Sequence, residues 1–249
     1  MTIGLPAWTR REAFSYMESL AGPLLAWEYL RRNPAYRNAW ILHDPADTET
    51  ARHDWALLLF IDPALDARAA NPIWCPDPPT TLRLIPATGA RDGVKLYDLD
   101  IDRSAPDAVR DEAGTYLTAV VGRNSWKVHI ADGLSPQDSF AIAINADAHA
   151  QRRAAAAELF IRDLGGRSVG AKKRRPAPNR MGRFHASVLQ ALDGAAAGAS
   201  HREIAVAIHG DKWVSRRWTP DGELRAGIRY FLKRGARLVA GDYRRLIYR

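Results

Sequence analysis

Cysteine is almost absent from this chain. Among its 249 residues the single cysteine is Cys75. One cysteine cannot form an intramolecular disulfide, and it cannot supply the several thiolates of a zinc site or an iron–sulfur cluster. The composition therefore excludes a disulfide-stapled secreted fold, and we expect a protein of the reducing cytoplasm.

Long apolar runs are missing as well. The run from Trp55 to Ile61 covers seven residues, far fewer than the ~20 that a membrane-spanning helix needs. The segment 1–10 has no basic stretch followed by an apolar core, so we expect no signal peptide. A membrane is therefore not an expected partner.

Catalytic and metal-binding signatures are also lacking. Residues 165–172 do not end in the Gly-Lys-Ser/Thr of a phosphate loop. Asp98, Asp100 and Asp102 are not followed by the glycine and glutamate of a calcium loop. The seven histidines form no His-x-x-x-His pair. We expect no catalytic residue, no metal and no cofactor, and hence a protein that is not an enzyme.

Charge, by contrast, is abundant and unevenly distributed. The formal net charge is +8. Residues 1–150 carry 14 basic and 20 acidic side chains, whereas residues 151–249 carry 22 basic and 8 acidic ones. The first part has a net charge of −6 and the second a net charge of +14. This asymmetry points to a polyanion as the partner of the second part.

Composition and periodicity divide the chain into four segments. Residues 1–78 form a helical N-terminal domain, and residues 79–164 form a β-rich middle region that ends in an alanine-rich helix. Residues 165–182 form a linker rich in glycine, proline, lysine and arginine, and residues 183–249 form a helical C-terminal domain. We therefore expect one mixed, multi-domain chain.

Local patterns predict the elements of these segments. Thr9 and Glu12 match a capping box at the start of the first helix. Period-two alternation predicts strands, at 82–85, 94–101, 116–121, 125–130 and 139–144. The predicted fold class is α+β: an N-terminal helical segment and a small antiparallel β-rich middle, followed by an all-α helix-turn-helix variant domain.

Three helices are predicted in the C-terminal domain. Ser200 and Glu203 form a capping box that starts a short second helix, which ends at Gly210. Thr219 and Pro220 predict the start of a longer third helix, followed by a short strand at 237–240. A short helix before a longer basic one fits a helix-turn-helix arrangement.

The third predicted helix carries a basic stripe. Arg225, Arg229 and Lys233 recur every four residues and lie beside an apolar face. Such a helix can neutralise phosphates and reach base edges in the major groove, although a merely solvated helix face gives the same pattern. The expected DNA-binding residues are Arg202, Lys212, Arg216, Arg217, Arg225, Arg229, Lys233 and Arg234.

The linker contains a second basic cluster. Lys172, Lys173, Arg174 and Arg175 are consecutive. Such a run either tracks the phosphate backbone as a flexible arm or keeps the linker solvated, and the sequence leaves both alternatives open.

The N-terminal part resembles a known domain. The segment 25–37, with the sequence LAWEYLRRNPAYR, is similar to the transcriptional-regulator-like domain of many proteobacterial proteins. The apolar run from Trp55 to Phe60 and the later Pro72 to Trp74 continue that similarity.

The C-terminal part resembles a helix-turn-helix variant domain. The residues that carry this similarity are 202–205, Trp218, 224–225 and 241–244. Together the two parts resemble the FseA-like excision activators of integrative and conjugative elements. The segment 209–218 is longer than an ordinary turn of this motif, and Asp242 stands where the family pattern has a second glycine.

The resemblance implies a transcriptional activator that switches on excisionase expression. Its implied partners are promoter DNA, RNA polymerase and a small antiactivator protein. A protein-binding regulator of the antiactivator type, which sequesters another transcription factor, remains the alternative, because its basic surface would bind protein instead of DNA.

Overall fold

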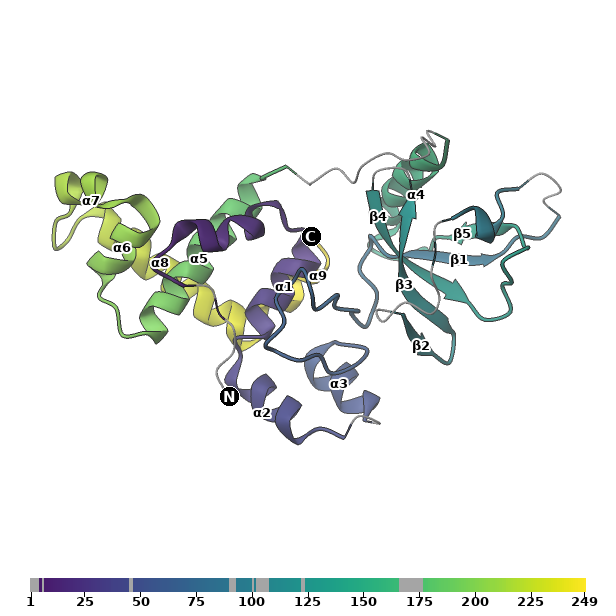
Figure 1. Cartoon of the computed structure of the whole chain (residues 1–249), viewed down its shortest axis with the longest axis horizontal. Coiled ribbons are helices and arrows are strands. Elements are labelled where there is room, and N and C mark those ends of the chain that lie inside the picture. The colour runs from purple at the N-terminus through teal and green to yellow at the C-terminus, as the bar shows by residue number, and fades with distance from the viewer. Residues whose placement is uncertain are drawn as a thin grey trace. The chain divides into compact units, whose positions relative to one another are not determined.

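The computed structural model describes residues 5, 7–44, 47–89, 93–99, 101, 108–121, 124–165 and 177–249. The chain forms two compact units. Unit 1 comprises Met1–Pro76 and Pro176–Arg249, and unit 2 comprises Asp77–Arg175 (Figure 1). In the part of the chain that the structure describes, no helix is long and apolar enough to span a membrane.

Unit 2 is built on a five-stranded sheet in the order β2-β3-β4-β1-β5. β3 and β4 pair antiparallel over their whole length, whereas β1 pairs with β4 in parallel. The α+β fold class is confirmed, but the sheet is mixed instead of antiparallel throughout. Its strands are β1 (Leu82–Pro86), β2 (Val109–Asp111), β3 (Gly114–Val121), β4 (Asn124–Ala131) and β5 (Phe140–Ala143).

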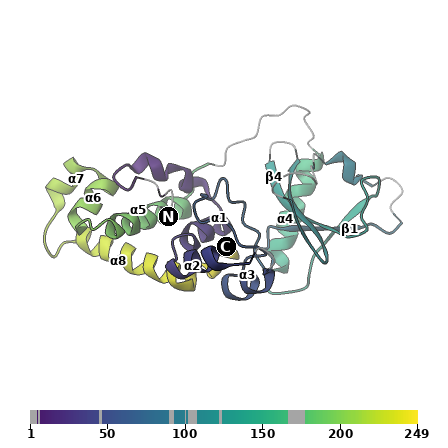
Figure 2. The same ribbon diagram turned by 60° about the horizontal axis from the view of Figure 1, so that its bottom comes forward.

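One face of this sheet is covered by α4 (Ala150–Gly165). The helix α4 lies against the sheet in Figure 2. Its Ala156, Ala157 and Phe160 pack on inward-facing strand residues such as Leu117 and Val128. Because side chains alternate between the two faces of a strand, every second residue of β3 contributes to this core. Burial of this apolar layer holds unit 2 together.

The predicted strand at 94–101 is wrong. Residues 96–98 instead form the short 3-10 helix η2 (Leu96–Asp98). The Asp98 carboxylate accepts a hydrogen bond from the Lys95 backbone amide at 2.9 Å. An aspartate whose side chain hydrogen-bonds to nearby backbone favours a turn over a strand. The alternation of apolar and polar residues, from which the strand was predicted, does not report such a hydrogen bond.

Unit 1 combines helices from both ends of the chain. The first segment supplies the 3-10 helix η1 (Arg11–Ser19) and α1 (Gly22–Leu30), α2 (Pro34–Leu42) and α3 (Thr48–Trp55). The second segment supplies α5 (Arg180–Ala196), α6 (His201–His209), α7 (Asp211–Arg217), α8 (Glu223–Arg237), the π-helical η3 (Leu238–Asp242) and α9 (Arg244–Ile247).

Local residues explain the start of α2, whereas two other predicted boundaries in unit 1 are wrong. The Asn33 side chain accepts bonds from the first amides of α2, and Pro34 occupies its first turn. The predicted capping box at Thr9 is wrong, because η1 begins after Arg10 without a side-chain cap. The predicted strand at 237–240 is wrong as well, since α8 continues directly into η3.

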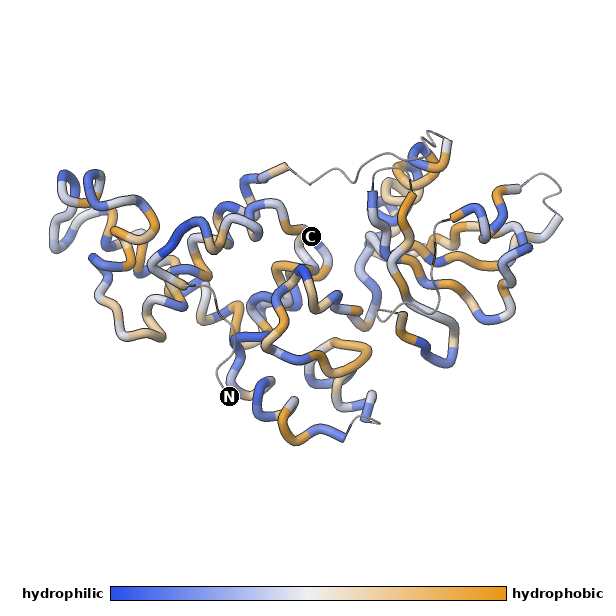
Figure 3. Tube along the Cα trace, viewed as in Figure 1, coloured by the Kyte–Doolittle hydropathy of each residue, from blue (hydrophilic) through white to orange (hydrophobic). Residues whose placement is uncertain are grey.

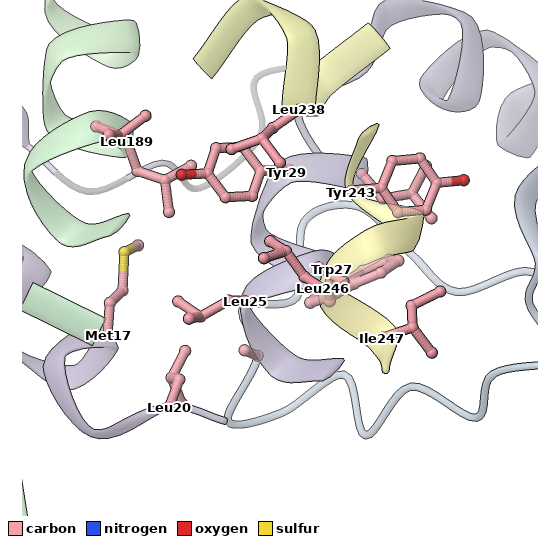
Figure 4. Packing of buried hydrophobic residues seen from close by; sticks show 14 of the residues in the cluster. Met17, Leu20, Leu25, Trp27, Tyr29, Leu189, Leu238, Tyr243, Leu246 and Ile247 are labelled. Atoms are coloured by element: carbon pink, nitrogen blue, oxygen red, sulfur yellow. The ribbon is translucent and has the colours of Figure 1, made fainter. Parts of the chain in front are cut away.

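The core of unit 1 joins the two segments. Met17, Leu20 and Leu25 of the first segment share one cluster with Leu189 of α5, and the Trp27 ring lies beside Leu246 of α9 (Figure 4). The helices approach closely: a Cβ atom at Gly22 would lie 2.2 Å from the Leu246 carbonyl oxygen. The predicted division treated residues 1–78 and 183–249 as separate domains, whereas these segments share one hydrophobic core.

Among the described residues of unit 1, four charged side chains form a buried cluster. Arg32 donates from Nε and Nη2 to the two carboxylate oxygens of Asp193, at 2.8 Å each. Its Nη1 donates to Glu28 Oε2 at 2.8 Å, and Arg31 Nη1 lies 3.3 Å from that same oxygen. None of the four residues is more than 7 % exposed. The two positive and two negative charges balance.

Hydrogen bonds complete this charged cluster. Glu28 Oε1 accepts from the Tyr16 hydroxyl at 2.9 Å and from the Ala67 amide at 2.8 Å. Arg31 donates to the carbonyl oxygens of Pro63 and Ala64. Burial by itself lowers the pKa of Arg32, but the carboxylates of Asp193 and Glu28 outweigh it and raise that pKa above its usual value. The Arg32 guanidinium therefore stays charged.

Arg32→Ala should destabilise unit 1 by about 3–5 kcal/mol, because Asp193 would be left as a buried charge that has lost its bidentate partner. Urea unfolding followed by circular dichroism measures this loss. As the control, Arg245→Ala removes an exposed partner of Asp242, 3.7 Å away, and should change stability by less than about 0.5 kcal/mol. A loss below about 1 kcal/mol for Arg32→Ala would contradict the assigned role.

Stability should also fall in mild acid through His185. This residue is 2 % exposed and hydrogen-bonds the Tyr29 hydroxyl at 2.7 Å. Burial, followed by the charges of Arg234 and Arg249, lowers its pKa from 6.5 to about 4. As the pH falls, His185 is protonated in the unfolded chain before it is protonated in the folded chain. The free energy of unfolding that is present above pH 6.5 is therefore lost as the pH falls toward 4.

The expected loss is about 2 kcal/mol between pH 7.5 and pH 5, measured as the change in unfolding free energy in urea. His185→Gln should remove this part of the pH dependence. His53→Gln should retain it, because the His53 side chain is exposed. Equal pH dependence in wild type and His185→Gln would refute the assignment.

Candidate nucleic-acid interface

Helices α6 and α7 form a tight helix-turn-helix pair at one end of unit 1, away from α2 and α3 (Figures 1 and 2). The predicted capping box starts α6: Ser200 Oγ accepts from the Glu203 amide at 3.3 Å, and Glu203 Oε2 accepts from the Ser200 amide at 2.7 Å. These bonds satisfy two amides that the first helical turn leaves without partners.

A single residue joins α6 to α7. Gly210 ends α6 and precedes α7, with φ +89° and ψ 145°. Only glycine adopts this conformation without strain, because it has no Cβ atom. The predicted end of α6 at Gly210 is confirmed.

The segment between α6 and α8 departs from the prediction. Residues 209–218 were expected to form a long turn before the basic helix, but residues 211–217 form α7. The next helix, α8, begins after Gly222, so the predicted start at Thr219 and Pro220 is wrong. With one buried apolar residue in seven, Val214, α7 is too short for apolar periodicity to reveal it.

A small core holds the pair on α5 and α8. Ile204, Ala205 and Ile208 of α6 pack with Val214 of α7. Ala191 of α5 and Ile228 of α8 complete the cluster. Val214 is the one buried residue of α7. The side of α7 that carries Val214 therefore packs on the cluster, and the opposite side is exposed to solvent.

The outward side of α7 is basic and aromatic. Lys212, Trp213, Arg216 and Arg217 are all exposed. Helical spacing places Lys212 and Arg216 opposite Val214, with Trp213 and Arg217 at the flank of that outward face. The Arg217 guanidinium lies 4.9 Å from the centre of the Trp213 ring, within reach of a cation–π contact. This helix is mostly hydrophilic in Figure 3.

Arg202 and Arg225 converge beside this pair. They line an open hollow of about 530 Å³ together with His201 and Trp218. The Arg225 side chain is anchored, because its Nη1 donates to the Pro220 carbonyl oxygen at 2.6 Å. The arrangement places two cations, from α6 and α8, at one concave surface that suits a phosphate group.

The rest of the predicted stripe on α8 separates into two groups. Arg229 and Lys233 are exposed. Arg234 is half-buried, and its charge acts on Tyr29 and His185 in the core of unit 1. Arg234 therefore lies apart from the basic face of α7. The cluster Lys172, Lys173, Arg174 and Arg175 lies outside the described residues.

Sequence reasoning missed one aromatic member of the site. Trp213 is 40 % exposed, and its ring packs on that of His209 at 5.1 Å between centres. The available signal was a tryptophan among basic residues just after a helix-ending glycine. In the described ranges, no group of three or more His, Cys, Asp or Glu side chains is placed to hold a metal ion.

Two family models match the chain. Residues 142–248 match a model described as a T6SS transcription factor, DNA-binding domain, of the RovC type. Residues 7–57 match the proteobacterial transcriptional regulator-like domain. No curated protein matches the chain. The first match includes all of the α6–α7 pair, and the second includes Glu28, Arg31 and Arg32 of the buried cluster. Together the two matches support a DNA-binding transcription factor, with a regulator-like domain and a DNA-binding domain on one chain.

Proposed function

We propose that this chain regulates transcription by placing α7 in the major groove of promoter DNA. The observation that carries this proposal is the exposed surface of α7, where Lys212 and Arg216 stand opposite the single buried residue Val214 and the exposed Trp213 and Arg217 flank them. In helix-turn-helix proteins the second helix of the pair enters the major groove. By position in the chain, α7 is that helix.

The proposal divides the basic residues by role. Lys212 and Arg216 lie on the outward side of α7, where a lysine or an arginine can donate to the acceptors of a guanine. Arg202 and Arg225 line the concave surface beside α6 and suit backbone phosphates, which position a protein without reading sequence. Arg229 and Lys233 extend the positive surface along α8.

We further propose that the chain is an activator that switches on excisionase expression in an integrative and conjugative element. The resemblance of both terminal parts to FseA-like activators supports this, as does the −6 charge of residues 1–150, which suits protein contacts. RNA polymerase and a small antiactivator are the proposed protein partners. The proposal places the chain in the cytoplasm and assigns it no catalytic residue and no cofactor.

Binding of the full chain to promoter fragments should weaken steeply with salt. If about six phosphates are neutralised, affinity should fall by roughly a thousandfold between 50 and 200 mM salt. Arg225→Ala should lower the salt slope by about 1, whereas Arg216→Ala should cost about 1–3 kcal/mol and relax sequence preference. Fluorescence anisotropy on labelled duplexes measures both effects.

The matched control for these variants is Arg162→Ala. Arg162 pairs with Glu158 on the exposed side of α4 in unit 2, and its loss should leave affinity and salt slope unchanged. If Arg216→Ala binds like wild type while Arg229→Ala loses specific affinity, then α8 and not α7 reads the DNA.

The activator proposal predicts increased transcription at occupied promoters. Chromatin immunoprecipitation of the full chain should find it upstream of an excisionase gene, with raised transcript levels and raised excision measured by PCR across the rejoined ends. A Lys212→Ala and Arg216→Ala double variant should lose occupancy and activation together. The antiactivator-type alternative predicts the opposite result: no DNA occupancy, and reduced transcription when another regulator is present.

A further inference from the structure

The carboxyl end of α6 is held by residues from outside the helix pair. The last carbonyl groups of a helix have no partner within that helix. The Ala207 carbonyl oxygen accepts from Gln190 Nε2 of α5 at 3.2 Å. The Ile208 carbonyl oxygen accepts from Arg11 Nη1 of η1 at 3.4 Å. Both carbonyl groups immediately precede the turn at Gly210.

The N-terminal segment reaches the same place through Trp8. The Gln190 amide that contacts Ala207 also donates to the Trp8 carbonyl oxygen at 2.8 Å. At Gly194 of α5, a Cβ atom would lie 3.1 Å from the Trp8 ring and 3.0 Å from the Ile204 side chain. Trp8, α5 and α6 are therefore packed closely, and an added methyl group would require these side chains to shift by a few tenths of an ångström.

Contacts continue from η1 to the outward face of α7. Burial, and in addition the Arg11 charge, lowers the pKa of His209, the last residue of α6. The His209 ring packs on Trp213, which in turn contacts Arg217. A series of neighbours thus connects an arginine of the regulator-like segment with the basic face of α7.

Helix α7 depends on α6 for its direction. It has seven residues, one buried side chain and a one-residue connection to α6. A positive charge at the carboxyl end of α6 is stabilising, because the helix dipole is negative there. Arg11 supplies that charge from the other segment of unit 1.

We propose that Arg11 is a positioning residue for DNA recognition, which fixes the α6–α7 turn and thereby the angle at which α7 is presented. The inference rests on the proposed function for the role of α7 in binding DNA. It adds that the regulator-like segment sets the sequence preference of the DNA-binding domain without contacting DNA. Because a single residue joins the two helices, a small rotation of α6 also rotates the outward face of α7.

The test compares three variants of the full chain: Arg11→Ala, Arg11→Lys and, as the matched control, Arg10→Ala. Arg11 is exposed, so each variant is expected to fold, and thermal unfolding checks this. The DNA probes are a duplex selected from a random library by the wild-type chain and a scrambled duplex of equal composition. Anisotropy at several salt concentrations gives affinity and salt slope.

Arg11→Ala should bind the selected duplex about tenfold more weakly, within the usual range of coupling between sites, and the scrambled duplex as wild type does. Arg11→Lys should recover most of the preference, and Arg10→Ala should retain all of it. A weaker affinity for both duplexes, with a salt slope reduced by about 1, would make Arg11 a phosphate contact and overturn the proposal. Unchanged affinity for both would overturn it as well.

A second readout needs no DNA. Nuclear magnetic resonance titration of His209 reports the nearness of the Arg11 charge, and the indole signal of Trp213 reports the geometry of the turn. Arg11→Ala should raise the pKa of His209 and shift the Trp213 signal, whereas Arg10→Ala should do neither. If wild type binds neither duplex, the proposed function fails, but the Trp213 signal still decides whether Arg11 holds the turn. An unchanged Trp213 signal in Arg11→Ala would overturn that part.

Discussion

The bidentate pair between Arg32 and Asp193 is the constraint on which unit 1 depends. Removing four charges from water is costly, and their mutual attraction repays this only when every member has its partners. Glu28, Arg31 and Arg32 come from the regulator-like segment, whereas Asp193 comes from the DNA-binding segment. Neither segment alone can satisfy its own buried charges. Residues 7–57 of the regulator-like match therefore fold together with the part of the DNA-binding match that lies in unit 1, from α5 to α9.

This constraint and the candidate interface meet on α5. Gln190 and Asp193 are three residues apart, so they lie on neighbouring positions of the same helix surface. Asp193 receives Arg32, and Gln190 contacts the carboxyl end of α6. The charged cluster thus fixes the register of α5 against the N-terminal segment, and α5 fixes the helix pair. Rigid support of this kind is what a site for sequence readout needs.

Local signals allowed part of this to be predicted from sequence. The Ser200 capping box, the stop at Gly210 and the strands at 116–121 and 125–130 are set by near neighbours, and the structure has them at these places. Helix α7 was missed because Val214 is its single buried residue. The partial burial of Arg234 and the pairing of Arg32 with Asp193 depend on residues far apart in sequence, and no local pattern reports such contacts. For the same reason, the shared core of unit 1 was not predicted.

The arrangement of unit 1 also sets an order of events during synthesis. Unit 2 is continuous, so all its strands and α4 are available once residue 175 has left the ribosome. Arg32 can pair with Asp193 only after Asp193 has been synthesised, and Asp193 is 161 residues later in the chain. At about 5–20 residues per second, this delay is roughly 8–32 s. During that time α1 exposes Trp27 and Tyr29, which are fully buried in the finished fold. The nascent chain therefore has a long interval in which its N-terminal helices need protection from aggregation, and the sheet of unit 2 folds first.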